Sequence, residues 1–243
     1  TVNPAANYMW TGPSCTGTSG LSCSKLTVGA ADTVIVCTYT NTRKSGTLQV
    51  KKTWVNAHVG DTAAISVTGI VNAATAGLNS TADSANETDV GSIVTMYAGE
   101  TANFSETVNP AANYTSSFIC AVPEKRMVMK IPGDTYTMPS TPVDVVCTYT
   151  NTRKSATLQL KKTWVNAHVG DTASLTATGL TNSATVALNS TADSANETDA
   201  GTAVTVFAGE VATLGETVNP AANYTSTGPS CTGTSGLSCS KLT

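Results

Sequence analysis

Three side chains in this sequence could react with one another: the amine of Lys52, the carboxyl group of Glu106 and the carboxamide of Asn151. Segment 48–54 alternates apolar and polar residues, and residues two apart in a strand point to the same face. Lys52 therefore lies with the apolar residues on the face that we expect to point inward. Asn151 ends a second alternating segment, 145–151, on the same kind of face.

Burial of an amine or a carboxyl group without a partner is costly, so such groups are expected to meet or to react. Burial lowers the pKa of an amine and raises that of a carboxyl group, which favours the neutral form of each. A neutral lysine amine is a nucleophile, and a protonated glutamate can polarise a carboxamide and shuttle a proton. These residue types predict an amide bond between Lys52 and Asn151, formed with loss of ammonia.

The strands that must position these residues belong to a repeated unit. The sequence LNSTADSANETD occurs at 78–89 and again at 188–199, a spacing of 188 − 78 = 110 residues. A repeat of this length predicts small modules in tandem. The expected modules are the C-terminal part of one module at 1–45, a complete module at 46–155, and a module without its last strand at 156–243. A segment of a longer tandem array, cut at an arbitrary phase, would have this arrangement.

The hydrophobic pattern within the complete module has a period of two and not 3.6. About seven short alternating segments are separated by turns rich in Asn, Asp, Gly and Pro. This pattern predicts an all-β fold in which each repeat is an Ig-like β-sandwich. Stretch 123–142 has no counterpart in the other modules, and we interpret it as an alternative hairpin over the same edge of the core.

Composition excludes several classes of function. Charged residues are 12% of the chain and the net charge is −3, so no nucleic-acid partner is expected. The sequence contains no run of 18 apolar residues, so we expect no membrane insertion. Seven cysteines favour an oxidising compartment. His58 and His168 each stand alone, no Cys/His cluster is present, and no Ser/His/Asp grouping repeats; we expect no metal, no other cofactor and no turnover enzyme.

The motifs LQVKKTW, GETVNPAANY and CTYTNT resemble the first strand, the E-box and the final strand of CnaB/SpaA-type (prealbumin-like) domains of bacterial surface adhesins and pilins. The resemblance covers the complete module and both partial ones. It implies an intramolecular isopeptide bond between the lysine of the first strand and the asparagine of the last, with the E-box glutamate as catalyst. In the complete module these residues are Lys52, Asn151 and, as catalyst, Glu106. In the last module they are Lys162 and Glu216, and the asparagine would lie beyond residue 243. The first module contributes Asn41, and its lysine would lie before residue 1.

One departure from the family pattern is Asn113, which stands where the family usually has a glycine before the tyrosine. Asparagine tolerates similar backbone angles, so the motif is retained. The structural alternative is an ordinary sandwich in which the Lys52 amine reaches the edge of the core and Asn151 caps a turn.

The cysteines predict a second kind of crosslink. Cys120 and Cys147 are the two cysteines of the complete module, on the strand after the E-box and on the last strand. We expect a disulfide between them, and the equivalent pair in the first module is Cys15–Cys37. The competing connectivity, Cys15–Cys23 with Cys231–Cys239, stays open, although the complete module has no counterpart of Cys23.

The leading hypothesis is a structural repeat region of an extracellular stalk or fibre on a bacterial surface. Its partners would be neighbouring repeats or further copies of itself, and a host or surface ligand would bind regions outside this chain. Near-identical modules suit a spacer, because stacking adds length without adding specificity.

Two alternatives are a carbohydrate- or host-protein-binding array and a self-assembling filament. A binding array predicts a repeated exposed aromatic or charged cluster, and the repeats carry mostly Thr, Ser and Ala. In the filament, segment 28–45 of the next copy would complete the last module, with Asn41 meeting Lys162. A cut through a longer array explains the incomplete module equally and is the preferred interpretation.

Overall fold

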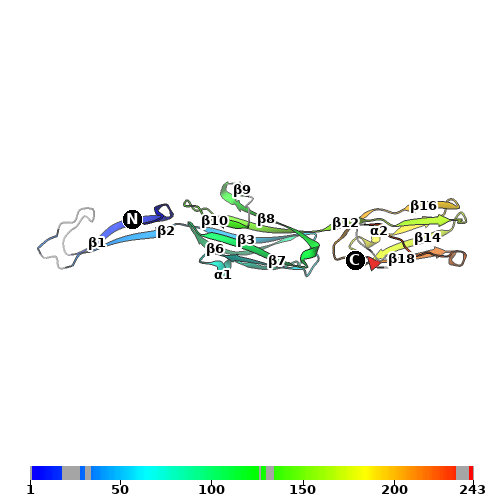
Figure 1. Cartoon of the computed structure of the whole chain (residues 1–243), viewed down its shortest axis with the longest axis horizontal. Helices are drawn as coiled ribbons and strands as arrows, with labels where there is room; N and C mark the ends of the chain where they lie inside the picture. Colours follow the sequence, from blue (N-terminus) through cyan, green and yellow to red (C-terminus); the bar gives the residue numbers. More distant parts are fainter. Residues whose placement is uncertain are drawn as a thin grey trace. The chain divides into compact units, whose positions relative to one another are not determined.

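The computed structural model of the chain describes residues 2–17, 28–30, 34–125, 127–129, 134–233 and 241–242. The described residues form β-strands with a few single-turn helices, which confirms the predicted all-β class (Figure 1). The chain divides into two compact units, residues 1–111 with 116–152, and residues 112–115 with 153–243. The division into modules at 45/46 and 155/156 stays a prediction. No helix among the described residues is long and apolar enough to cross a membrane.

The elements up to residue 153 are short helices and strands, and they include both alternating segments singled out in the sequence, 48–54 and 145–151. The short helices are η1 (Ala5–Asn7), α1 (Ala73–Ala76), η2 (Ala111–Asn113) and η3 (Pro123–Lys125). The strands are β1 (Tyr8–Thr16), β2 (Val36–Arg43), β3 (Ser45–Val55), β4 (Thr62–Thr68), β5 (Leu78–Thr81), β6 (Glu87–Tyr97), β7 (Thr101–Asn109), β8 (Tyr114–Val122), β9 (Met127–Met129), β10 (Thr135–Thr137) and β11 (Val145–Arg153).

The complete module contains two sheets, with strand orders β6-β3-β11-β8-β9 and β10-β7-β4-β5. Their inner faces share one cluster of buried side chains, in which Leu48 and Val50 of β3 join Ile65 of β4 and Phe104 of β7. Buried and less buried residues alternate along β3 and along β11, as the period of two predicts. The module is therefore a β-sandwich whose first and last strands lie in the same sheet.

Strands β3 and β11 are neighbours and run parallel. Val145 lies opposite Leu48, and the pairing continues to Thr152 opposite Val55. Since the chain enters β3 at Ser45 and leaves β11 at its far end, the two connections of the module lie at opposite ends of this strand pair.

The predicted hairpin at 123–142 is wrong. β9 pairs with β8 in one sheet, whereas β10 pairs with β7 in the other. β10 joins the second sheet because its inward side chains pack in the core. Tyr136 and Met138, which are two residues apart and so point to the same side, are both buried. The segment therefore closes the edge of the sandwich by contributing one strand to each sheet.

β1 and β2 form a two-stranded ribbon in which Cys15 lies opposite Cys37 and Trp10 lies opposite Asn41. The side chains on its faces are largely in solvent; Trp10 is 71% exposed and Tyr39 is 68% exposed. A single residue, Lys44, separates β2 from β3.

The second unit repeats the fold of the complete module in part. Its strands are β12 (Ser155–Leu158), β13 (Lys161–Val165), β14 (Thr172–Thr178), β15 (Leu188–Thr191), β16 (Asn196–Ala200), β17 (Val204–Phe207), β18 (Ala212–Asn219) and β19 (Lys241–Leu242), and its helices are α2 (Ser183–Val186) and η4 (Ala221–Asn223). The counterpart of β3 is broken into β12 and β13, which pair separately with β17 and β16.

Candidate functional site: a buried lysine, glutamate and asparagine

The structure brings Lys52, Glu106 and Asn151 together inside the complete module. Lys52 Nζ lies 3.2 Å from Glu106 Oε1, and Asn151 Nδ2 donates a hydrogen bond of 3.1 Å to the same oxygen. Lys52 and Asn151 are both 0% exposed, and the Glu106 side chain is 4% exposed. One carboxylate oxygen thus contacts both the amine and the carboxamide in a site closed to water.

Each residue reaches the site because its strand alternates. Lys52 follows Leu48 and Val50 on the inward face of β3, and Asn151 follows Cys147 and Tyr149 on that of β11. Glu106 comes from β7 in the opposite sheet, where it continues the inward series of Ala102 and Phe104. The site therefore spans the sandwich, with amine and carboxamide on one sheet and carboxyl group on the other.

Burial governs the charge of the lysine. Desolvation lowers the pKa of Lys52 from 10.5 to about 8, although the Glu106 and Asp89 carboxylates and the hydrogen bond to Glu106 act in the opposite direction. Lys52 therefore loses its proton far more readily than an ordinary surface lysine, and the neutral amine is the nucleophilic form.

The carboxamide of Asn151 is only half satisfied. Its Nδ2 donates to Glu106, while its Oδ1 is buried and has no hydrogen-bond partner among the described residues. A buried carbonyl oxygen without a donor typically costs about 1–3 kcal/mol. The complete module thus holds the Asn151 amide oxygen without a hydrogen-bond donor, close to the Lys52 amine, whose pKa is lowered by burial.

Further contacts hold the lysine, and sequence reasoning missed them. The Lys52 ammonium lies 3.9 Å from the centre of the Trp54 ring, a cation–π arrangement. Trp54 Nε1 donates to Ser80 Oγ at 2.7 Å, and Ser80 donates in turn to Asp89 Oδ2 at 2.6 Å. The signal that could have found this chain of contacts is its recurrence in the next repeat.

The same contacts recur in the second unit, as Trp164 to Ser190 at 2.7 Å and Ser190 to Asp199 at 2.6 Å. There Lys162 Nζ lies 2.8 Å from Glu216 Oε1, with the two side chains 15% and 30% exposed. No asparagine is hydrogen-bonded to Glu216 among the described residues; Ser226 Oγ donates to it instead, at 3.2 Å. Lys162 and Glu216 thus form the pair without the carboxamide.

The remaining predicted residue, Asn41, is exposed on β2 opposite Trp10. No described lysine or glutamate lies at hydrogen-bond distance from Asn41. The first module therefore has the asparagine without its partners, whereas the second unit has the lysine and the glutamate without the asparagine.

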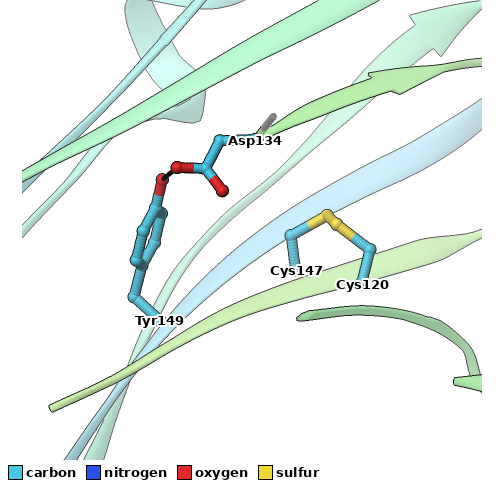
Figure 2. Close-up of a disulfide and its surroundings, with 4 residues drawn as sticks. All are labelled: Cys120, Asp134, Cys147 and Tyr149. Atoms are coloured by element: carbon cyan, nitrogen blue, oxygen red, sulfur yellow. Dashed lines mark hydrogen bonds between the residues drawn. A yellow bond between two sulfur atoms is a disulfide. The ribbon is translucent and has the colours of Figure 1, made fainter. Parts of the chain in front are cut away.

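A disulfide joins Cys120 of β8 to Cys147 of β11, with a Cα–Cα distance of 4.0 Å (Figure 2). Two residues further along β11, the Tyr149 ring packs on Phe118. The Tyr149 hydroxyl donates a hydrogen bond of 3.4 Å to Asp134 Oδ2 (Figure 2). In the ribbon, the sulfurs of Cys15 and Cys37 lie 2.9 Å apart across β1 and β2. The alternative pairings through Cys23 and Cys239 lie outside the described residues.

No family model matches the chain, and no curated protein matches it. Among solved structures, the crystal structure of the major pilin from Streptococcus pyogenes is similar at 17% sequence identity and a TM-score of 0.27, over 50% of this chain and 55% of the pilin chain. A likeness this distant assigns no function, so the function is argued from the site itself.

Proposed function

We propose that the chain is a self-crosslinked structural region of an extracellular fibre or stalk on a bacterial surface, of the pilin or adhesin kind. The observation that carries the proposal is the buried set Lys52, Glu106 and Asn151, in which one carboxylate oxygen contacts both reacting groups. Its partners would be neighbouring repeats and further copies of the same protein, and any adhesive ligand would bind elsewhere.

The proposed reaction is a single turnover. Proton transfer from the Lys52 ammonium to Glu106 produces a neutral amine and a carboxylic acid. Lys52 Nζ attacks Cγ of Asn151, the new C–N bond forms as the bond to Nδ2 breaks, and Glu106 relays the proton to the departing nitrogen. The products are a secondary amide and ammonia, which leaves as ammonium ion. The reaction needs no metal or other cofactor.

The consequence would be mechanical. Because β3 and β11 are parallel and the chain enters and leaves at opposite ends of the pair, tension loads the two strands in shear. A covalent bond from Lys52 to Asn151 would carry that tension directly and bypass the segment between them, which has a sequence separation of 151 − 52 = 99. By analogy with disulfides, closing such a loop would stabilise the module by about 4–5 kcal/mol.

Intact mass of the reduced chain tests this function. Formation of one amide bond removes one ammonia, about 17 Da. We expect that loss in the unmodified chain and no loss in Glu106→Ala, because the variant has no group to move the proton. Peptide mapping should place the bond between Lys52 and Asn151.

Glu216→Ala is the matched control, because it removes the equivalent carboxylate from the second unit, where no asparagine lies beside the lysine. It should keep the full loss of about 17 Da. An unshifted mass in the unmodified chain, with the module folded, would refute the crosslink.

A further inference from the structure

Ser80 connects the ring that lies against the Lys52 amine to a second carboxylate. Trp54 Nε1 donates a hydrogen bond of 2.7 Å to Ser80 Oγ, and Ser80 Oγ donates one of 2.6 Å to Asp89 Oδ2. An indole nitrogen can only donate and a carboxylate can only accept, so the serine hydroxyl must accept from Trp54 and donate to Asp89. The direction of both hydrogen bonds is therefore fixed.

These contacts hold the Trp54 ring in place beside the lysine. Lys52 and Trp54 are two residues apart on the inward face of β3, and Lys52 Nζ lies 3.9 Å from the ring centre. Trp54 is 0% exposed and Ser80 is 5% exposed. Ser80 belongs to β5 and Asp89 to β6, which are edge strands of the two sheets. The ring that contacts the amine is thus fixed by groups from both sheets.

Asp89 is the second carboxylate close to the amine, and its hydrogen bond is to Ser80. It lies opposite Lys52 in the pairing of β3 with β6, and side chains of opposite residues lie on the same face of a sheet. The carboxylates of Glu106 and Asp89 both raise the pKa of the amine. The ion pair of 3.2 Å is with Glu106. An Asp89 carboxylate paired with Lys52 would hold the amine in its charged, unreactive form.

The second unit has the same arrangement around Lys162. Trp164 Nε1 donates to Ser190 Oγ at 2.7 Å, and Ser190 Oγ donates to Asp199 Oδ2 at 2.6 Å. Asp199 lies opposite Lys162 in the pairing of β13 with β16, yet the ion pair of Lys162 is with Glu216, at 2.8 Å. In both units the lysine pairs with the glutamate, while a serine binds the aspartate that lies opposite the lysine.

We propose that Ser80 is a positioning residue for the crosslinking reaction. It holds the Trp54 ring against the Lys52 amine and keeps the Asp89 carboxylate from pairing with that amine, so that Glu106 alone receives the proton. The inference rests on the proposed function and adds no bond-forming step to it, because Ser80 acts through Trp54 and Asp89 and not on the reacting atoms.

The rate at which ammonia is lost tests this role. The full chain is recovered unfolded in urea, diluted into neutral buffer to start folding, and quenched with acid at intervals before its reduced intact mass is measured. We expect Ser80→Ala to lose the mass of about 17 Da at least about tenfold more slowly than the unmodified chain. The reason is that Asp89, without its serine, pairs with the Lys52 ammonium and raises the pKa of the amine.

Two further readouts separate positioning from a structural role. The rate of Ser80→Ala should rise with pH along a curve displaced to higher pH by about one unit, because a second carboxylate then stabilises the ammonium. Ser80→Ala combined with Asp89→Asn should recover most of the rate, because the competing charge is gone. Asp89→Asn alone keeps an acceptor for Ser80 Oγ and should react at least as fast as the unmodified chain.

Ser190→Ala is the matched control, because it removes the equivalent hydroxyl from the second unit and should leave the rate unchanged. An unchanged rate in Ser80→Ala, or a slow loss that Asp89→Asn does not relieve, overturns the positioning role and leaves the crosslink in place. A slower reaction in Asp89→Asn alone also overturns it, and this variant decides the question where Ser80→Ala does not fold. An unmodified chain that never loses ammonia refutes the proposed function, and the inference falls with it.

Discussion

At the scale of single residues, the molecule keeps a lysine in a site that opposes its charge. Lys52 is fully buried, its pKa is lowered to about 8 by desolvation, and a single carboxylate and an indole ring lie against its ammonium group. A buried ion pair is weak evidence for stability, because taking both charges out of water offsets much of their attraction. The adjacent carboxamide oxygen of Asn151 has no donor, so the site as a whole is not arranged to satisfy its buried polar groups.

A pH dependence of stability follows from the lowered pKa. Asn151→Ala removes the carboxamide that the proposed crosslink needs, so Lys52 stays a free amine in this variant. Between pH 8 and 10.5 the unfolded state holds a proton that the folded state has released, so the free energy of unfolding should rise with pH. The rise is at most about 3 kcal/mol, from 10.5 − 8 = 2.5 units. Urea denaturation across this range measures it.

Asn151→Ala combined with Lys52→Met is the control for that experiment. The double variant retains the tyrosines and other groups that titrate at high pH, and lacks only the buried amine. The free energy of unfolding of Asn151→Ala should rise with pH relative to that of the double variant. Parallel curves would show that Lys52 titrates alike in the folded and unfolded states.

At the scale of elements, the close pairing of β3 with the segment that leads into β11 limits which residues fit. A Cβ added at Gly46 would overlap the backbone carbonyl oxygen of Val143. The second unit has Ala156 at the equivalent position, exposed, on the edge where no strand is described. At this position the complete module thus leaves room for the segment that leads into its last strand, whereas the second unit carries a side chain there.

Gly46→Ala should therefore destabilise the complete module by about 1–3 kcal/mol, because backbone atoms must move apart. Thermal or urea unfolding of the complete module measures the change. Ala156→Gly is the reciprocal control, and we expect it to change the stability of the second unit by less than about 1 kcal/mol. Equal effects at both positions would contradict the close approach at Gly46.

At the scale of the whole chain, the connection between the ribbon and the complete module is hydrogen-bonded and not a free hinge. The Lys44 amide donates to the Asn7 carbonyl at 2.9 Å, and the Ala98 amide donates to the Lys44 carbonyl at 2.9 Å. Arg43 donates to the Ala98 carbonyl through Nε and Nη2, at 3.0 and 2.8 Å. The NPAAN turn before β1 is thereby joined to the turn after β6.

Arg43→Ala should loosen this connection. Hydrogen bonds from a charged donor contribute roughly 1.5–3 kcal/mol, so the amide hydrogens of Lys44 and Ala98 should exchange at least about tenfold faster with deuterium. The second unit provides an internal control, since the Lys154 amide donates to Asn113 and the Ala208 amide to Lys154 in the same way. Those two amides should keep their rates, and unchanged exchange at Lys44 would show that Arg43 does not hold the connection.

Much of the fold is encoded in local pattern. The period of two predicted the inward faces of β3 and β11, and so placed Lys52 and Asn151 in the core, because side chains alternate whatever the strand packs against. The E-box motif indicated Glu106. Local pattern did not reveal that β9 and β10 join different sheets, because pairing partners are chosen by packing over long distances in sequence.

The sharpest contrast is between two copies of one sequence, residues 36–45 and 146–155. Both form a strand, since strand propensity and alternation are properties of the segment itself. Tyr149 is 4% exposed in one copy, and Tyr39 is 68% exposed in the other. Whether this segment is a buried strand that contributes an asparagine to the core or an uncovered strand depends on the sheet that faces it, because burial is created by residues far away in the chain.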